Sequence, residues 1–138
     1  MRVYALSDVH VDYAENLAWI RGLTQAEFSD DLLLLAGDVT DDIGLLEEVL
    51  SHLRDCFKQV FFVPGNHDIN NDVMRDVWNK RSGVPFYSFV YKDVLFLALD
   101  STGEKGQIVP DYQVEYMKQA LAKHTAVRWT FVFIHHPL

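Results

Sequence analysis

Apolar positions along this chain gather into short continuous runs, and each run stops at a cluster of polar residues. The runs lie at residues 2–7, 32–36, 59–63 and 128–134 and are rich in leucine, valine and aromatic residues. A run of this length that is bounded by polar residues is typical of a strand buried on both faces. The pattern therefore predicts four buried strands.

Apolar residues recur at intervals of three and four in the segments between these strands, which indicates amphipathic helices. We expect Asp41 or Asp42 to be the N-cap of the helix that follows them. Strands that alternate with such helices pair in parallel through right-handed crossovers, so the fold class is expected to be α/β. The predicted helices cover residues 14–23, 43–57, 70–79 and 110–123.

Residues 86–99 depart from this alternation. Two apolar segments, 86–91 and 94–99, are separated only by Lys92-Asp93. So short a polar connection predicts a tight antiparallel hairpin, which would make the sheets mixed rather than wholly parallel. Residues 101–109 contain two glycines and few apolar residues, and we expect a mobile loop there.

The polar clusters that follow the four strands carry Asp, His and Asn. They are Ser7-Asp8-Val9-His10, Gly37-Asp38-Val39-Thr40-Asp41, Gly65-Asn66-His67-Asp68 and His135-His136-Pro137. Ligands of such sheets bind outside the carboxyl ends of the strands, so these clusters are expected to meet. Oxygen and imidazole ligands without a thiolate suit Mn, Fe, Zn or Co. The sequence thus predicts one metal site at the mouth of the sheet.

The length and net charge of the chain limit the number of domains and the kinds of ligand that we expect. A chain of 138 residues that is 49% apolar can bury the core of one domain. The 12 basic residues against 20 acidic ones give a net charge of −8, which argues against a general nucleic-acid-binding surface. A phosphorylated substrate remains compatible with this charge, because bound divalent metals reverse its sign locally.

The cysteine content and the absence of long apolar runs bear on the compartment. Cys56 is the single cysteine of the sequence and has no partner for an internal disulfide, which favours a reducing environment. Asp8 and His10 follow the first apolar residues too soon for a signal peptide. No apolar run reaches the roughly 20 residues of a membrane span. We therefore expect a cytoplasmic protein without membrane contact, and the sequence leaves its oligomeric state open.

The four clusters resemble the motifs of the calcineurin-like metallophosphoesterases. That family carries Asp-x-His, Gly-Asp-x-x-Asp, Gly-Asn-His-Asp/Glu and a histidine often written His-x-Pro, in this order, and then Gly-His-x-His. The first four match Asp8-Val9-His10, the segment 37–41, the segment 65–68 and His135-His136-Pro137. The fifth is absent from the sequence. The resemblance implies an α/β/β/α sandwich of mixed sheets flanked by helices, with residues 1–138 as a C-terminally truncated domain of this kind.

The resemblance also implies a site with two divalent metal ions, of which Mn, Fe, Zn and Co are all compatible. Asp8 and His10 would bind the first ion and Asp38 would bridge both. Asn66 and His135 would bind the second; His135 is preferred to His136, although the alternative stays open. Each ion would lack one protein ligand, because the histidines of the fifth motif are absent.

The implied activity is hydrolysis of a phosphate monoester or diester, with a phosphorylated small molecule or phosphodiester as substrate. A hydroxide that bridges the metals would attack phosphorus, His67 would protonate the leaving oxygen, and Asp68 would orient the His67 ring. The alternative is a catalytically inactive binding or scaffold domain that retains the fold. A nucleotide-binding α/β domain is disfavoured, because no glycine fingerprint is present.

Other polar residues have simpler interpretations. Asp12 is expected to cap a helix, as Asp41 or Asp42 would. Asp100 is as compatible with a turn at a strand end as with a supporting role beside the site. Solvated surface charge is the preferred interpretation of three cations that could instead steer a phosphate, Lys80, Arg81 and Lys105.

Overall fold

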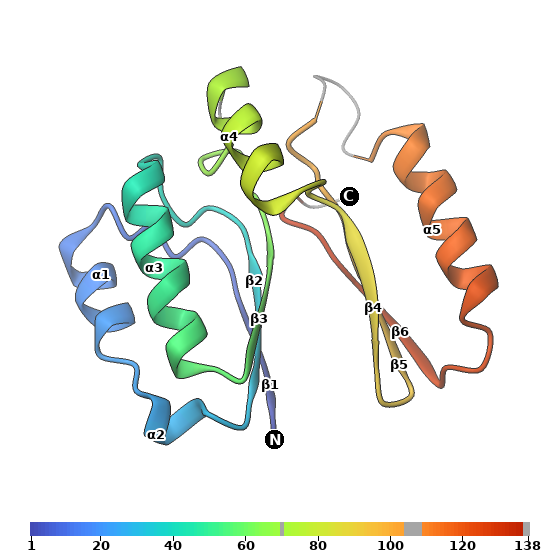
Figure 1. Ribbon diagram of the computed structural model, residues 1–138, viewed down its shortest axis with the longest axis horizontal. Coiled ribbons are helices and arrows are strands. Elements are labelled where there is room, and N and C mark those ends of the chain that lie inside the picture. Colours follow the sequence, from blue (N-terminus) through green and yellow to red (C-terminus); the bar gives the residue numbers. More distant parts are fainter. Residues whose placement is uncertain (70, 104–108, 137–138) are drawn as a thin grey trace.

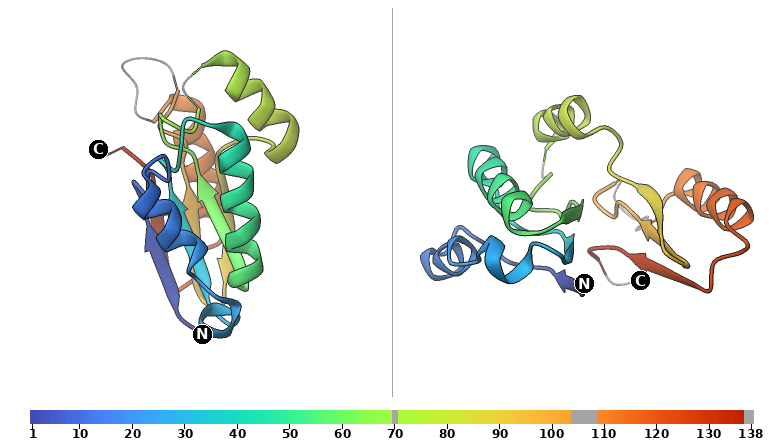
Figure 2. Two further views of the ribbon diagram at one scale, coloured as in Figure 1. Left: turned by 90° about the vertical axis from the view of Figure 1, so that its left-hand side faces the viewer. Right: turned by 60° about the horizontal axis from the view of Figure 1, so that its bottom comes forward.

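The computed structural model describes residues 1–69, 71–103 and 109–136, with the side chains of 81 and 82 excepted. Two three-stranded sheets pack against each other and helices cover their outer faces, so the layers run α/β/β/α (Figures 1 and 2). The predicted α/β fold is confirmed. The elements in chain order are β1 (Val3–Leu6), α1 (Ala14–Arg21), α2 (Gln25–Phe28), β2 (Leu32–Ala36), α3 (Ile43–Cys56), β3 (Gln59–Val63), α4 (Asp72–Ser82), β4 (Tyr87–Tyr91), β5 (Val94–Ala98), α5 (Asp111–Lys123) and β6 (Trp129–Phe133).

The first sheet, called the parallel sheet below, has the order β1-β2-β3, and both of its strand pairs are parallel. Its central strand β2 is buried along nearly its whole length, which explains its continuous leucine run. Leu33 and Leu35 of β2 pack with Leu46, Val49 and Leu53 of α3 in one core cluster. The helix thus covers the outer face of this sheet.

The second sheet, called the mixed sheet below, has the order β4-β5-β6. The predicted hairpin is confirmed: β4 and β5 pair in antiparallel fashion, and Lys92 at the turn has a positive φ of 52°. The strands β5 and β6 pair in parallel through the crossover helix α5. Leu95 and Leu97 pack against Ala120 and Met117 of this helix, so α5 covers the outer face of the mixed sheet.

Aromatic side chains join the two sheets. Phe61 of β3 stacks on Phe89 of β4 with ring centroids 3.6 Å apart, and Phe89 in turn stacks on Phe96 at 4.8 Å. The Tyr87 hydroxyl donates a hydrogen bond to the carbonyl of Phe62 across the same boundary. Stacked rings contribute beyond the apolar area that they bury, so these contacts hold the middle of the sandwich together.

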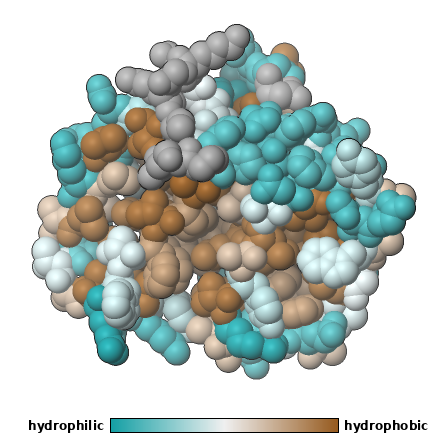
Figure 3. All heavy atoms as spheres, turned by 180° about the vertical axis from the view of Figure 1, so that it is seen from behind, coloured by the Kyte–Doolittle hydropathy of each residue, from teal (hydrophilic) through white to brown (hydrophobic). Residues whose placement is uncertain are grey.

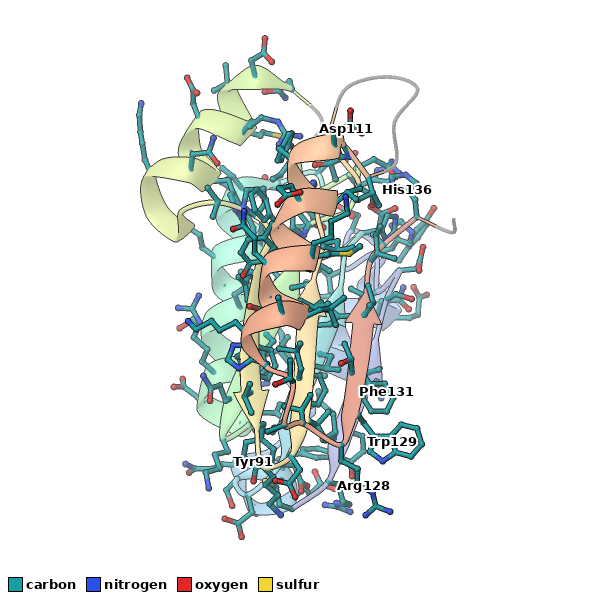
Figure 4. The ribbon with its side chains drawn as sticks, turned by 90° about the vertical axis from the view of Figure 1, so that its right-hand side faces the viewer. Tyr91, Asp111, Arg128, Trp129, Phe131 and His136 are labelled. Atoms are coloured by element: carbon teal, nitrogen blue, oxygen red, sulfur yellow. The ribbon has the colours of Figure 1, made fainter. Side chains whose placement is uncertain are left out.

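The edge strands β1 and β6 were expected to be buried, but they are largely exposed, because no further strand pairs with them in the part of the chain that the structure describes. Trp129 and Phe131 of β6 are 60% and 55% exposed, and Val3 of β1 is 46% exposed. Figure 4 shows the two aromatic side chains of β6 pointing outward from the strand. Figure 3 shows apolar residues gathered over the same face of the molecule. Within the described residues, no helix has the length and apolar character needed to cross a membrane.

The structure corrects several local predictions. The short helix α2 was not expected, and α4 runs from Asp72 to Ser82 instead of covering 70–79, because Asn71 caps its start and Gly83 with φ 79° ends it. Asp42, rather than Asp41, caps α3 by accepting from the N–H of Leu45. Part of the loop expected at 101–109 lies outside the described residues.

Asp12 is not a helix cap, although one was expected. The N-cap position of α1 belongs to Tyr13, and the Asp12 carboxylate accepts a hydrogen bond from the Thr40 hydroxyl at 2.6 Å. Thr40 lies in the loop after β2. Asp12 therefore ties the loop after β1 to the loop after β2.

Candidate metal centre

The loops after β1 and β2 hold an uncommon backbone conformation. Asp8, His10 and Asp38 have φ values of 53°, 45° and 54°, in the left-handed region that residues other than glycine seldom adopt. Backbone hydrogen bonds fix this geometry: the N–H of Asp8 donates to the carbonyl of Gly37, and that of His10 donates to the carbonyl of Asp38. Such conformations cluster at functional sites, where the surrounding structure maintains them.

Two glycines let the loops after β2 and β3 approach each other closely. A Cβ atom on Gly65 would lie 2.1 Å from Oδ1 of Asp38. A Cβ atom on Gly37, whose φ is +77°, would lie 2.5 Å from the backbone nitrogen of Gly65. Only glycine fits at either position without moving the opposite loop, which explains why glycine precedes Asp38 and Asn66 in the sequence.

Asp68 fixes these two loops to each other. Its carboxylate accepts hydrogen bonds from the backbone N–H groups of Gly65, Asp38, Val39 and Thr40, at 2.7–3.2 Å. The side chain is buried, and burial raises its pKa while the four N–H donors act in the opposite direction. Asp68 therefore positions the backbone around Asp38 rather than the ring of His67.

Three side chains from distant parts of the chain meet at the carboxyl ends of the strands. The ligand atoms of Asp8, Asp38 and His135 all lie within 4.8 Å of one another. Asp8 follows β1 and Asp38 follows β2, whereas His135 follows β6, so both sheets contribute to the cluster. Nε2 of His135 lies 3.3 Å from Oδ2 of Asp38.

The orientation of His135 indicates what this cluster can hold. Its Nδ1 lies 2.9 Å from the carbonyl oxygen of Ala36, and because a carbonyl only accepts, Nδ1 carries the proton of that bond. In the neutral ring, Nε2 then directs its lone pair at a carboxylate oxygen of Asp38. A metal cation beside both atoms, or a proton on Nε2, offsets the repulsion between this lone pair and the carboxylate. Metal-binding histidines are commonly oriented by such a bond from the other ring nitrogen, so these residues fit a divalent metal.

His67 faces the cluster from the loop after β3. Its backbone N–H donates to Oδ1 of Asp38 at 3.0 Å, and its Nε2 lies 3.9 Å from Oδ2 of the same residue. Its Nδ1 lies 3.0 Å from Oδ1 of Asp41, and this hydrogen bond raises the pKa of His67. The expected partner of the ring was Asp68, and the structure gives this contact to Asp41 instead.

The sequence interpretation missed the role of Asp41, although a signal was present. Asp41 stands three residues after Asp38, at the last position of the Gly-Asp-x-x-Asp motif. It was assigned to helix capping because it also precedes a helix. A carboxylate in this loop can serve either purpose, and only the path of the backbone decides between them.

The remaining predicted ligands take different places. The ring of His10 packs edge-to-face against that of His67, with centroids 5.3 Å apart. Asn66 is exposed on the loop before His67, and its metal contact stays a prediction. The backbone N–H and Nδ1 of His136 both contact the Ser101 hydroxyl, so His135 is the histidine that faces Asp38.

Asp100 is more than a residue at a turn. Its buried carboxylate accepts from Nη1 of Arg75, and also from the N–H and hydroxyl of Thr102. It thus connects helix α4 with the loop after β5. Of the cations considered for phosphate steering, Lys80 is exposed, whereas Lys105 and the side chain of Arg81 lie outside what the structure describes.

Comparison with known proteins agrees with this geometry. The family model described as calcineurin-like phosphoesterase matches residues 1–138. A curated relative, the [acyl-carrier-protein] phosphodiesterase PptH of Mycobacterium tuberculosis, is 34% identical over 76 residues, and this match spans 53% of the chain but only 23% of the relative.

A solved structure shares the fold. The crystal structure of the phosphopantetheinyl hydrolase PptH from Mycobacterium tuberculosis superposes with a TM-score of 0.65 at 18% identity, over 98% of this chain and 68% of that one. At this identity the likeness establishes the architecture alone. The family model, which matches residues 1–138, shows that the chain belongs to the calcineurin-like phosphoesterase family.

Proposed function

We propose that this chain carries the site of a metal-dependent phosphoesterase that hydrolyses a phosphate monoester or diester. The observation that supports this most strongly is the approach of Nε2 of His135 to Oδ2 of Asp38, 3.3 Å apart, with Nδ1 of His135 held by the carbonyl of Ala36. Asp8 supplies a further carboxylate within reach of both. Two carboxylates and an imidazole nitrogen gathered in this way are a suitable ligand set for a divalent cation.

Five residues would hold two divalent ions in this proposal. Asp38 would be shared between them, with Asp8 and His10 on one side and Asn66 and His135 on the other. Such ions offset the charge of a phosphoryl group and lower the pKa of a bound water molecule. The tight backbone contacts of the loops keep the carboxylates in place before any ligand arrives, which reduces the cost of binding.

His67 would protonate the leaving oxygen from Nε2. The contact of its Nδ1 with Asp41 orients the ring and favours the protonated form that an acid requires. The exposed side of the ring leaves room for a substrate, since 45% of the His67 side chain is accessible. In this proposal Asp41 is the positioning residue for His67, and Asp68 holds the loop that carries it.

A diester is the preferred substrate class. The curated relative is named as a phosphodiesterase acting on an acyl carrier protein, and the related crystal structure is named as a phosphopantetheinyl hydrolase. The first name states the bond type, a phosphodiester. We extend only this bond type to the present chain, and phosphate monoesters are the second candidate.

The test is hydrolysis of bis(p-nitrophenyl) phosphate and of p-nitrophenyl phosphate, after chelation and then with added Mn²⁺. We expect turnover that requires Mn²⁺ and is faster with the diester. The Asp38→Asn variant should be inactive, because an amide cannot supply two anionic oxygens. A protein that binds no metal and hydrolyses neither ester would support the inactive scaffold domain instead.

A further inference from the structure

The candidate metal centre is divided between the two sheets. Asp8 and Asp38 come from the parallel sheet, and His135 comes from the mixed sheet. The distance between these ligands therefore depends on how the sheets are held together at the carboxyl ends of their strands. At this end the Nδ1 hydrogen bond of His135 to the carbonyl of Ala36 already joins the segment after β6 to β2, and a second connection would hold the loops on either side of that bond.

Arg75 provides a connection of this kind. It lies in the first turns of α4, the helix that follows the loop of Asn66, His67 and Asp68 (Figure 1). Its Nη1 donates to Oδ2 of Asp100 at 3.2 Å, and its Nη2 donates to the carbonyl and the hydroxyl of Thr102 at 2.7 and 2.8 Å. The guanidinium of Arg75 thus makes three hydrogen bonds to Asp100 and Thr102, in the loop after β5.

The loop after β5 is in turn bound to the segment that carries His135. The N–H of Leu99 donates to the carbonyl of Phe133 at the end of β6. The Ser101 hydroxyl contacts both the N–H and Nδ1 of His136, the residue next to His135. Figure 4 shows His136 at the carboxyl end of β6, at the same end of the molecule as the start of α5. A displacement of this loop would therefore move His135.

The helix α5 fixes the same loop from the other side. The side-chain amide of Gln113, which is fully buried, accepts from the N–H of Asp100 and donates to its carbonyl, at 3.0 and 2.7 Å. With the backbone of Asp100 held by α5, its carboxylate remains available to Arg75. Residues 99–102 thus support the segment of His135, and Arg75 links them to α4.

We propose that Arg75 is a positioning residue for the metal centre: by joining α4 to the loop after β5, it holds His135 at binding distance from Asp8 and Asp38. This inference deepens the proposed function and rests on it. In this proposal Arg75 acts through protein oxygens, since its Nη atoms bind Asp100 and Thr102. A planar guanidinium can donate to a carboxylate, a carbonyl and a hydroxyl at once, because its N–H groups point in fixed directions. A lysine ammonium has no such fixed arrangement of donors.

The test measures Mn²⁺ affinity by isothermal titration calorimetry. We expect Arg75→Met to weaken binding about tenfold or more, the range seen when residues that orient metal ligands are removed. The Mn²⁺ affinity of Arg75→Lys should lie between that of Arg75→Met and that of the unaltered protein, because lysine restores the charge but not the planar set of N–H donors. The electron paramagnetic resonance spectrum of bound Mn²⁺ should change in Arg75→Met, which a loss of stability alone would not cause.

Two control variants separate positioning from general effects. Arg21→Met removes an exposed ion pair with Glu48, and Val49→Ala opens a small space in the core of α3. Both should bind Mn²⁺ with unaltered affinity, although Val49→Ala is less stable. If Arg75→Met does not fold, the double variant Arg75→Met/Asp100→Asn removes the unpaired buried carboxylate, and it should show the same loss of affinity.

The possible outcomes distinguish this inference from the proposed function. If the unaltered protein binds Mn²⁺ and either Arg75 variant binds it equally well with the same spectrum, Arg75 has no positioning role. If the unaltered protein binds no Mn²⁺, the proposed function itself is wrong. An equal loss of affinity in Val49→Ala and Arg75→Met would also contradict the inference, because destabilisation would then explain both.

Discussion

The two ends of the parallel sheet differ in how their charged side chains are arranged. At the amino ends of its strands, Arg2 pairs with the buried carboxylate of Asp31, with Nη2 and Oδ2 2.7 Å apart. At the carboxyl ends, Asp8 and Asp38 lie close together, and Nε2 of His135 faces Asp38. The amino ends thus pair opposite charges, whereas the carboxyl ends place two carboxylates close together.

The backbone conformation also distinguishes the carboxyl ends of the strands. Asp8, His10 and Asp38 at the carboxyl ends have positive φ values, each of which costs stability in a residue other than glycine. Strained backbone conformations of this kind are typical of functional sites, where the remainder of the fold compensates for their cost in stability. The comparison suits the proposal above: an ion pair joins Arg2 and Asp31 at the amino ends, whereas the carboxyl ends carry the candidate metal centre.

The largest expected effect is on turnover at the carboxyl ends. Replacing His67 with Ala should lower kcat by about 10²–10⁴-fold, the usual contribution of a general acid. Mn²⁺ affinity should remain, because the predicted ligands are other residues. Steady-state kinetics and calorimetric titration measure the two quantities separately. Loss of turnover and of metal binding together would mean that His67 is not a separate acid.

Two glycines with the same sign of φ allow a matched test of the close approach between loops. Gly37 at φ +77° meets the backbone of Gly65, whereas Gly83 at φ +79° has open space around the position of a Cβ atom. Alanine is strained at both positions, but only Gly37→Ala also forces the loops apart. We expect Gly37→Ala to lower the free energy of unfolding by about 1–3 kcal/mol more than Gly83→Ala does, as measured by urea denaturation. Equal losses would show that the loops are not in close contact.

A smaller effect concerns the stability of the metal-free protein. Asp38→Asn should raise the free energy of unfolding by about 1 kcal/mol in the presence of a chelator, because it relieves repulsion among the clustered acceptors. Asp31→Asn at the amino ends should lower it, because Arg2 loses its charged partner. Opposite signs for these two substitutions would support the comparison. A loss of stability in both variants would contradict it.

The smallest effect is a dependence on pH at the amino ends. Hydrogen bonds from Arg2 hold the pKa of Asp31 below its ordinary value. The stabilisation from this pair is therefore present above the unfolded-state pKa, roughly 3.9, and is lost as the pH falls through the lowered folded-state pKa. The difference in urea midpoint between the wild type and Asp31→Asn should shrink from pH 7 toward pH 3. A constant difference over this range would exclude the ion pair as its cause.

The sequence predicted the strands better than the contacts of the loops. The runs at 32–36 and 59–63 gave β2 and β3 with their observed bounds, because β2 is apolar throughout and the apolar run of β3 stops at Pro64. The carboxylate of Asp68 could not be assigned in the same way. Its donors at residues 38–40 lie about thirty positions away, and no periodicity indicates which backbone groups a buried side chain meets.

The roles of the acidic residues in the second motif show the same limit. Asp41 and Asp42 both precede α3, and either could have capped it. The structure gives the cap to Asp42 and the ring of His67 to Asp41. Adjacent side chains leave the backbone in different directions, so a one-residue shift separates a structural role from a place beside the candidate metal centre.

The central claim is that Asp8, Asp38 and His135 hold a divalent cation in common. Anomalous diffraction from a crystal soaked in Mn²⁺ tests it most directly. We expect a peak about 2.0–2.3 Å from Nε2 of His135 and from a carboxylate oxygen of Asp38, which disappears in Asp38→Asn. A fully soaked crystal without density between these side chains, or with Mn²⁺ bound elsewhere on the chain alone, would contradict the account.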